Sequence, residues 1–403
     1  MKHQTKIEYN DFEFIEIPAK RMLRFIFLKY FYFDILMEEL EKIKIVKTER
    51  KCLYFDEKEQ KVNHKFNRIM REGFNNLKSI INGRDAVYIH QNSGIPLVGT
   101  NYFGIVDRDS SILEIKPVTG CNLKCIYCSV GESSLKKKTD YVVEKDYLIN
   151  EYEKLVKLKK NKVEAHINPQ GEPLIYGDIV ELVRGLKNIE KTKKVSFNTN
   201  GLLLNKELTD DLIKAGLDQI NISLNALDEK TASKLAGAHY NLEKILDLMN
   251  YINKKIKLII SPVIVPGIND SEIDKLIKLS KKLNCRIGLQ NFLKYKHGFN
   301  PVKQRTWEEF YRILDKKEKE HNIKLILDAE DFDIKKDEAL EKPFSKNKIV
   351  EAQIKMPGRY NNEMIAAAKD RAITVFDTKA KINDVVRVKI IRTKHNIFNA
   401  VEA

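Results

Sequence analysis

The chain has 403 residues, and 72 Lys and Arg against 57 Asp and Glu give it a formal net charge of +15 at pH 7. This length predicts two or three folding units, each with its own hydrophobic core. The positive charge favours a polyanionic partner, nucleic acid first and a membrane surface second, although a Lys-rich proteome produces the same composition. No apolar run reaches about eighteen residues, which excludes a spanning helix, and nothing resembles a secretory cleavage site, so we expect a cytoplasmic protein without a membrane partner.

Residues 1–95 form a charged region that we predict to be mainly helical. The apolar residues of 25–32 and 35–40 can lie on one side of a helix. No motif in this region carries chemistry, so we interpret it as a packing or substrate-capping domain. Turns around Gly94 and Gly99 lead into the next unit.

Residues 96–327 form the next expected domain, and from Ser111 to His321 its pattern is regular, because short apolar or β-branched runs alternate with amphipathic stretches. This alternation is typical of βαβ units and a parallel sheet, and hence of an α/β fold. Six repeats are too few for a closed eight-fold barrel and suit an open (β/α)6 partial TIM barrel. The expected strands are 111–115, 163–168, 194–198, 219–224, 258–265 and 286–292, and the expected helices are 146–160, 178–186, 206–215, 242–253, 270–283 and 306–321.

Three of the five cysteines lie in one loop, Cys121, Cys125 and Cys128, at a C-x3-C-x2-C spacing directly after the first expected strand. Structural zinc sites use four ligands, usually in separated pairs, and no second pair follows. Three thiolates fit a [4Fe-4S] cluster that keeps one iron open, although a merely structural or electron-carrying cluster has the same ligands. With Tyr127 before the last cysteine, the loop resembles the signature of the radical S-adenosylmethionine (SAM) superfamily. The resemblance implies that SAM binds the open iron and that its reductive cleavage gives a 5'-deoxyadenosyl radical.

Polar loops follow the other expected strands, at the edge where active sites of such folds collect. Gln170-Gly171-Glu172-Pro173 resembles the Gly-Gly-Glu-Pro motif of the family, which implies that Gly171 and Glu172 bind the amino group of SAM. Gln170 departs from the motif, which puts the backbone contact at that position in doubt. The resemblance further implies cofactor contacts at the ends of the third to fifth strands, which here are Thr199 with Asn198 as an alternative, Asn200, Ser223, Asn225 and backbone near Val265.

After a charged linker at 328–348, residues 349–403 read as five short strands joined by turns, which predicts a small OB-like β-barrel. The expected strands are 350–355, 364–368, 372–376, 385–392 and 397–402. The segment resembles a TRAM domain, which implies RNA binding. Candidate phosphate ligands are Arg359, Arg371, Arg387, Lys389, Arg392 and Lys394, and candidate stacking faces are Tyr360, Phe376 and Phe398, although the aromatics also suit a core.

The absence of further cysteine motifs reduces the number of reaction classes to consider. Cys52 alone precedes the loop and no cysteine follows Cys285, so a second cluster for sulfur insertion and auxiliary clusters are both disfavoured. A role of Cys52 and Cys285 as a pair of methyl-transfer cysteines stays an open alternative, although no motif supports it. No flavodoxin-like segment is present, so we expect an external electron donor such as ferredoxin or flavodoxin.

From these features we predict a radical SAM enzyme that modifies a nucleoside in RNA, with tRNA as the first candidate. From about Pro96 onward, the chain resembles uncharacterised archaeal radical SAM proteins with a terminal TRAM domain. Two alternatives stay open. The enzyme could act on a protein, lipid or small metabolite with the TRAM domain as an RNA anchor, or the chain could be a non-enzymatic RNA-binding iron–sulfur sensor. Lys136-Lys137-Lys138 could meet a phosphate near the active site or form a solvated turn.

Overall fold

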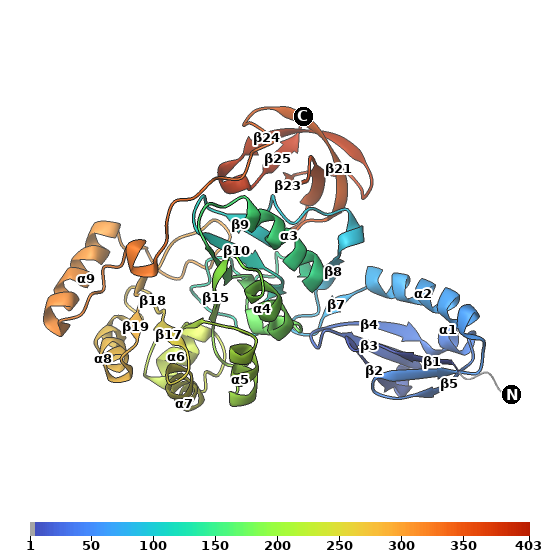
Figure 1. Ribbon diagram of the computed structural model, residues 1–403, viewed down its shortest axis with the longest axis horizontal. Coiled ribbons are helices and arrows are strands. Elements are labelled where there is room, and N and C mark those ends of the chain that lie inside the picture. Colours follow the sequence, from blue (N-terminus) through green and yellow to red (C-terminus); the bar gives the residue numbers. More distant parts are fainter. Residues whose placement is uncertain (1–4) are drawn as a thin grey trace.

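A computed structural model describes residues 5–403. The chain is organised in three parts (Figure 1): a central α/β core, an N-terminal domain that projects to one side, and a C-terminal barrel that lies on top of the core. No helix within 5–403 is long and apolar enough to cross a membrane.

The N-terminal domain is built mainly of strands, so the prediction of a mainly helical region is wrong. Its helices are α1 (Met37–Glu41) and α2 (Glu59–Asn75). Residues 25–32, expected in a helix, lie in the hairpin of β3 and β4. The strands are β1 (Thr5–Glu8), β2 (Phe12–Ile17), β3 (Met22–Phe27), β4 (Phe31–Leu36), β5 (Ile45–Thr48), β6 (Cys52–Phe55), β7 (Lys78–Ser79) and β8 (Asp85–Ile89).

The β3–β4 hairpin explains the error. Leu28 and Lys29 lie in its three-residue turn with φ of 47° and 65°, a backbone that favours Asn or Gly. Without those residues the turn gives no signal in the sequence. Along β3, side chains alternate between buried and half-buried, and the buried rings of Phe25 and Phe33 stack with centroids 4.9 Å apart.

The core is an open seven-stranded sheet in the order β19-β17-β16-β15-β13-β10-β9. Six of these strands run parallel, in chain order from β10 to β19, and β9 is antiparallel at one edge. The six expected strands therefore exist, the last two interrupted. The strands are β9 (Gly104–Asp107), β10 (Ile112–Lys116), β13 (Val163–Ile167), β15 (Thr192–Thr199), β16 (Gln219–Ile222), β17 (Lys257–Ile260) and β19 (Arg286–Ile287), and short β18 (Val263–Ile264) pairs with β20 (Gln290–Asn291).

Helices connect these strands, and all six expected ones are present, with boundaries that differ by a few residues. One further helix, α6 (Glu229–Ala236), was not predicted. The others are α3 (Lys145–Lys157), α4 (Ile179–Lys187), α5 (Lys206–Lys214), α7 (Leu242–Asn253), α8 (Ile273–Leu283) and α9 (Trp307–His321).

The boundary near residue 95 is crossed by the sheet of the N-terminal domain. Strand β12 (Thr139–Val143), which follows the cysteine loop, pairs in parallel with β8 along its full length. The N-terminal domain therefore joins the core through the segment directly after the cysteines.

The C-terminal segment forms the closed barrel β21-β22-β23-β25-β24, which confirms five strands at about the expected positions. The linker that precedes it packs against its surroundings, because Phe344 lies in the barrel core against Phe398. The strands are β21 (Ile349–Pro357), β22 (Met364–Ala368), β23 (Arg371–Phe376), β24 (Val385–Arg392) and β25 (Asn399–Glu402).

The barrel docks on residues 98–99, at the start of the core. The amides of Ala372 and Phe398 donate to the carbonyl oxygens of Val98 and Gly99, both at 2.8 Å. A Cβ on Gly99 would lie 2.0 Å from the carbonyl oxygen of Ala372, so this close approach requires glycine.

Candidate radical SAM active site

The cysteine loop begins at a tight pairing of two backbones. Thr119–Gly120 (β11) pairs in parallel with Gln170–Gly171 (β14). Gly171 has φ of 152°, and a Cβ there would lie 1.7 Å from the carbonyl oxygen of Gly120. The loop therefore depends on glycine at 171, whereas Gln170 is buried with its side chain against the cavity described next.

The three cysteines line one cavity of about 870 Å³, together with the ends of the core strands and one face of the barrel. The amide of Leu123 donates to Cys121 Sγ, and the amide of Glu132 donates to Cys128 Sγ, both at 3.4 Å. Such N–H···S bonds stabilise thiolates and tune bound clusters.

The backbone of the cysteine loop is hydrogen-bonded to the C-terminal end of helix α6, which was not predicted. The amides of Lys124 and Ile126 donate to the carbonyl oxygens of Ala236 and Leu235, both at 3.0 Å. Gly237 ends α6 with φ of 62°, and a Cβ there would lie 2.2 Å from the carbonyl oxygen of Lys124. The backbone of the loop is thus fixed by the protein itself.

The donor set fits an iron–sulfur cluster. Burial, the largest cause, raises the pKa of Cys125 to about 12 and also raises the pKa of Cys121. These two free thiols are therefore protonated at neutral pH, and ligation of iron must displace their protons. Cys52, in β6 of the N-terminal domain, and Cys285, after α8, do not line the cavity, which leaves three sulfur ligands and, on a cubane cluster, one open iron.

Glu172 lies on the cavity wall with only 2% of its surface exposed. Its carboxylate accepts hydrogen bonds from Thr199 Oγ1 at 2.6 Å, from the amide of Asn200 at 2.9 Å and from the amide of Leu174 at 3.2 Å. Burial outweighs these donors and raises its pKa to about 7. The side chain is an orientated acceptor, and no Lys or Arg within residues 5–403 forms an ion pair with it, which suits a ligand amino group.

The polar strand ends are brought together as predicted. Thr199, Asn200 and Ser223 line the cavity with Asn198. Asn225 lies behind them, where its Nδ2 donates to Tyr127 Oη at 2.6 Å and its Oδ1 accepts from the amide of Val263 at 2.8 Å. Asn225 therefore positions the aromatic residue of the cysteine loop, and its role as a direct SAM contact stays a prediction.

Val265 is misplaced by the prediction. It is fully buried, its amide donates to Asn269 Oδ1 at 2.7 Å, and the cavity is lined two residues earlier by Val263. The expected strand 258–265 breaks into β17 and β18, and this break moves the cavity-facing position.

The candidate RNA ligands fall into three environments. Arg387, Lys389, Arg392 and Lys394 are exposed, and Arg392 also lines the cavity. Arg371 is half-buried and donates to the carbonyl oxygens of Asp370 and Glu341, both at 3.0 Å. Arg359 is fully buried in ion pairs with Glu132 and Asp140, so its prediction as a phosphate ligand is wrong.

The aromatic candidates also differ. Phe398 belongs to the barrel core, which supports the core alternative for that ring. Phe376 and Tyr360 line the cavity, and Tyr360 packs on His297 with ring centroids 4.5 Å apart. Of the lysine run, Lys137 is buried against Glu132 at 2.5 Å, so it does not form the solvated turn.

Three polar residues on the inner face of the sheet, Glu114, Lys116 and Asn168, were not predicted, and they lie with Asn198, the alternative to Thr199. Lys116 Nζ contacts Glu114 at 2.9 Å and donates to the carbonyl oxygen of Asn168 at 2.8 Å, and Asn198 Nδ2 donates to Asn168 Oδ1 at 3.3 Å. These four residues line the cavity. The sequence held a signal for them, because polar and apolar residues alternate in two of the expected strands: every second residue of 114–116 and 164–168 is polar. Alternate residues of a strand lie on the same face of a sheet.

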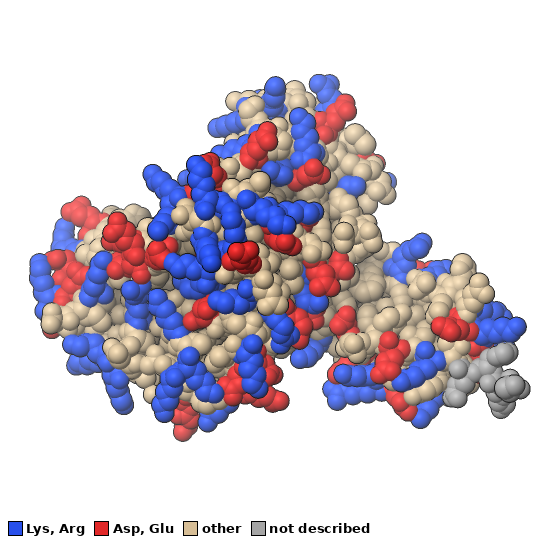
Figure 2. Space-filling view, viewed as in Figure 1, with Lys and Arg blue, Asp and Glu red and all other residues tan. Residues whose placement is uncertain are grey.

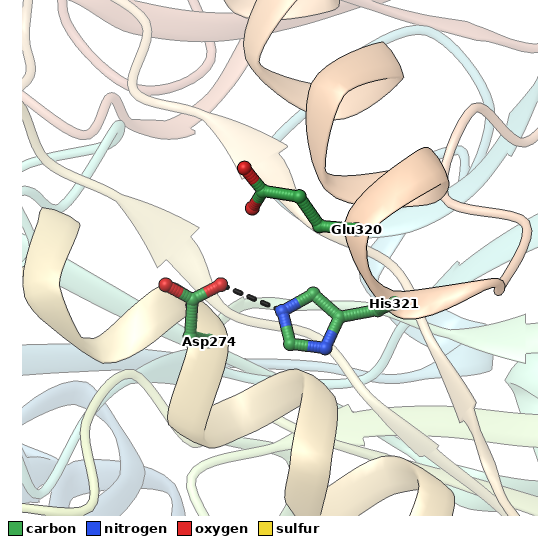
Figure 3. A group of neighbouring side chains, drawn as sticks. All are labelled: Asp274, Glu320 and His321. Atoms are coloured by element: carbon green, nitrogen blue, oxygen red, sulfur yellow. Dashed lines mark hydrogen bonds and ion pairs between the residues drawn. The ribbon is translucent and has the colours of Figure 1, made fainter.

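Asp274, Glu320 and His321 form a second group with metal-ligand chemistry, between α8 and α9 (Figure 3). His321 Nε2 lies 2.7 Å from Asp274 Oδ1. Lys317 Nζ lies 2.7 Å from both Asp274 and Glu320. The ammonium of Lys317 already pairs with both carboxylates, so we interpret the group as a link between the two helices.

Comparisons with known proteins agree with this geometry. Residues 115–280 match the model of the Radical SAM superfamily. The chain is 40% identical to the uncharacterised protein MJ0103 of Methanocaldococcus jannaschii over 81% of this chain and 82% of that protein. It is 30% identical to GTP 3',8-cyclase of Thermodesulfovibrio yellowstonii over 65% of this chain and 73% of the cyclase.

Other similarities cover different shares of the chain. GTP 3',8-cyclase of Clostridium botulinum is 33% identical over 43% of this chain, which spans about half, 54%, of that protein. Among solved structures, Streptococcus suis SuiB has a TM-score of 0.42 at 17% identity over 79% of this chain and 70% of that one. TYW1 with a lysine-pyruvate adduct has a TM-score of 0.40 at 21% identity over 58% of this chain and 80% of that one.

With three cysteines on one cavity, a buried glutamate beside them and this match in sequence, the chain belongs to the radical SAM superfamily, whose cofactors are a [4Fe-4S] cluster and SAM.

Proposed function

We propose that this radical SAM enzyme modifies a nucleoside within RNA, with tRNA as the substrate RNA. One observation carries the proposal: the barrel side chains Thr374, Phe376, Arg392 and Asn399 line the same cavity as the three cysteines. A strand of RNA held on this face of the barrel would therefore reach the reaction site without any movement of the domains.

The barrel has features that support an RNA partner. Its strand order, with the parallel pair β23–β25 closing against β24, agrees with the predicted OB-like and TRAM-like module. Arg392 offers a cation for a phosphate and Phe376 offers a ring for a base, both at the cavity. The open parallel sheet beneath, with its polar inner face, fits the predicted partial barrel.

Positive charge supports the same partner. On the face seen in Figure 2, Lys and Arg side chains gather over α3 and the region below the barrel. Lys154 and Lys157 on α3 and Lys160 just after it are exposed, and the chain as a whole carries +15. Such a surface attracts a polyanion over a long range and with strong dependence on salt.

Cys121, Cys125 and Cys128 would hold the cluster, which together with SAM would supply radical chemistry for hydrogen abstraction from the substrate. The residues of this chain bind and orient: Glu172 accepts from the amino group of SAM, and Thr199 and Asn200 hold the carboxylate of Glu172 in place. The core and the barrel together enclose the site. An external ferredoxin or flavodoxin provides the electron.

A free nucleotide is a second candidate substrate. Relatives at 30–33% identity carry the name GTP 3',8-cyclase, and the cavity holds the cations Lys116, Arg108 and Arg392, which suit phosphates. The barrel then serves as a wall of the nucleotide pocket.

The test is an anaerobic SAM-cleavage assay. Reconstituted protein is reduced with dithionite, and 5'-deoxyadenosine is measured alone, with total tRNA, with unmodified tRNA transcripts and with GTP. We expect tRNA to stimulate cleavage and to gain a mass change in one nucleoside after digestion. Arg392→Met should lose most of the stimulation, while Lys379→Met, which removes an exposed cation of the barrel away from the cavity, should keep it.

Other outcomes identify the alternatives. Stimulation by GTP and not by tRNA would establish the nucleotide reading. Cleavage that responds to neither would point to a peptide, lipid or other metabolite. A stable cluster with no 5'-deoxyadenosine under any condition would leave an RNA-binding sensor.

A further inference from the structure

A buried group of charged side chains lies directly behind the cysteine loop, where all three parts of the chain meet. Arg84 comes from the N-terminal domain, Glu132, Lys137 and Asp140 come from the core, and Arg359 comes from the barrel, two residues after β21. Asp140 and Arg359 are fully buried, and Lys137 and Glu132 are 2% and 4% exposed. Burial of so many charges costs free energy, which their mutual attraction offsets only where the pairing geometry is good and further hydrogen bonds are made.

Arg359 connects the two carboxylates of this group. One end of its guanidinium contacts the Asp140 carboxylate and the carbonyl oxygen of Thr139, and the other end contacts the Glu132 carboxylate. Its own carbonyl oxygen accepts from the amide of Lys138 at 2.9 Å. Only a planar fork can hold both partners at once, so lysine is not equivalent here.

The residues that carry these two carboxylates, Glu132 and Asp140, each form a hydrogen bond at one end of the cysteine loop. The amide of Glu132 donates to Cys128 Sγ at 3.4 Å, and its carboxylate is held further by Lys137 at 2.5 Å and Arg84 at 3.2 Å. Asp140 accepts from Thr119 Oγ1 at 3.0 Å, two residues before the first cysteine. Arg359 thus fixes the distance between the entrance and the exit of the loop.

We propose that Arg359 is a positioning residue for the iron–sulfur cluster, so that the docked barrel is part of the cluster site. Arg359 sets the position of Glu132, and through its amide the hydrogen bond to Cys128 Sγ. Hydrogen bonds to cluster sulfurs and the residues behind the ligands determine cluster potential and retention. This inference rests on the cluster and not on the identity of the substrate.

The test compares Arg359→Lys and Arg359→Met with Lys379→Met in the reconstituted full chain. Three properties are measured anaerobically: the rate at which a chelator removes iron, the electron paramagnetic resonance spectrum of the reduced cluster and its midpoint potential. We expect both Arg359 variants to lose iron about tenfold faster, in the range typical for residues behind metal ligands. Their spectra should change and their potentials should fall, because a thiolate without its N–H donor favours the oxidised cluster.

Arg359→Lys separates position from charge, because it keeps the cation and loses the fork. If Arg359→Lys loses iron at the wild-type rate and has the wild-type spectrum, while Arg359→Met differs in both, the side chain acts through its charge alone. That outcome would overturn the proposal. Circular dichroism checks folding. Where Arg359→Met fails to fold, Glu132→Gln takes its place, since it removes the carboxylate that the fork binds and keeps the amide, and wild-type behaviour of that variant would also refute the inference.

Discussion

The protonation of Glu172 should control how tightly the protein binds SAM. The carboxyl group is buried, and burial raises its pKa to about 7. Only the ionised form is a full acceptor for the amino group of SAM. The ionised fraction rises from about one tenth at pH 6 to about nine tenths at pH 8, so this group alone should tighten SAM binding about tenfold over that interval, or about 1.4 kcal/mol.

The assay is the dissociation constant of SAM on reconstituted, unreduced protein, measured by equilibrium dialysis between pH 6 and pH 8. Because the amino group of SAM titrates in the same range, the informative quantity is the wild-type constant divided by that of Glu172→Gln. The variant should bind about 10 to 100 times more weakly at pH 8, since a hydrogen bond to a charged group contributes about 1.5–3 kcal/mol. At pH 6, where only about one tenth of Glu172 is ionised, this difference should shrink about tenfold.

A second consequence concerns the SAM-free protein. The folded pKa lies above the unfolded value of 4.5, so the folded state binds the proton more tightly. This contribution to the free energy of unfolding is fully present below about pH 4.5 and is lost as the pH rises through about 7, by an amount on the order of 3 kcal/mol. Equal pH profiles for SAM binding in wild type and Glu172→Gln would refute the reasoning.

Further predictions address the framework of the site. Gly171→Ala should prevent cluster reconstitution and lower the free energy of unfolding by about 3 kcal/mol, because its Cβ would lie 1.7 Å from the Gly120 oxygen. Gly83→Ala is the control in urea unfolding, because it also introduces a side chain at positive φ, 71°, but meets no atom within 4 Å, and it should cost only about 1 kcal/mol. Lys159→Met should cost about 3–5 kcal/mol in the same measurement, because it leaves Asp107 buried without its ammonium partner at 2.6 Å. A cost below about 1 kcal/mol would show that Asp107 finds another partner. Replacement of Cys121, Cys125 and Cys128 by alanine should abolish iron binding but leave the circular dichroism spectrum unchanged, because the loop backbone is bonded to Leu235 and Ala236; a loss of ordered structure would contradict this.

The sequence by itself determined the chemistry of the core. The spacing of Cys121, Cys125 and Cys128 and the stretch from Gln170 to Pro173 are local patterns, and local patterns survive in the fold. The six parallel strands were predictable for the same reason, because short β-branched runs that alternate with amphipathic stretches are typical of βαβ units. Alternation inside those runs even carried the unpredicted polar residues Glu114 and Lys116.

Tertiary structure decided the rest. Residues 25–36 form a hairpin because the aromatic side chains find a shared core and stabilise a Leu28-Lys29 turn that has no local preference for that backbone. Val265 lost its predicted place because a break in the strand shifts which residue faces the cavity. Arg359 reads in the sequence as an exposed cation after a Pro-Gly turn, yet it is buried between Glu132 and Asp140, more than two hundred residues earlier in the chain. A charge is buried only where distant partners compensate for its lost hydration, and that compensation exists only once the barrel, the core and the N-terminal domain have come together.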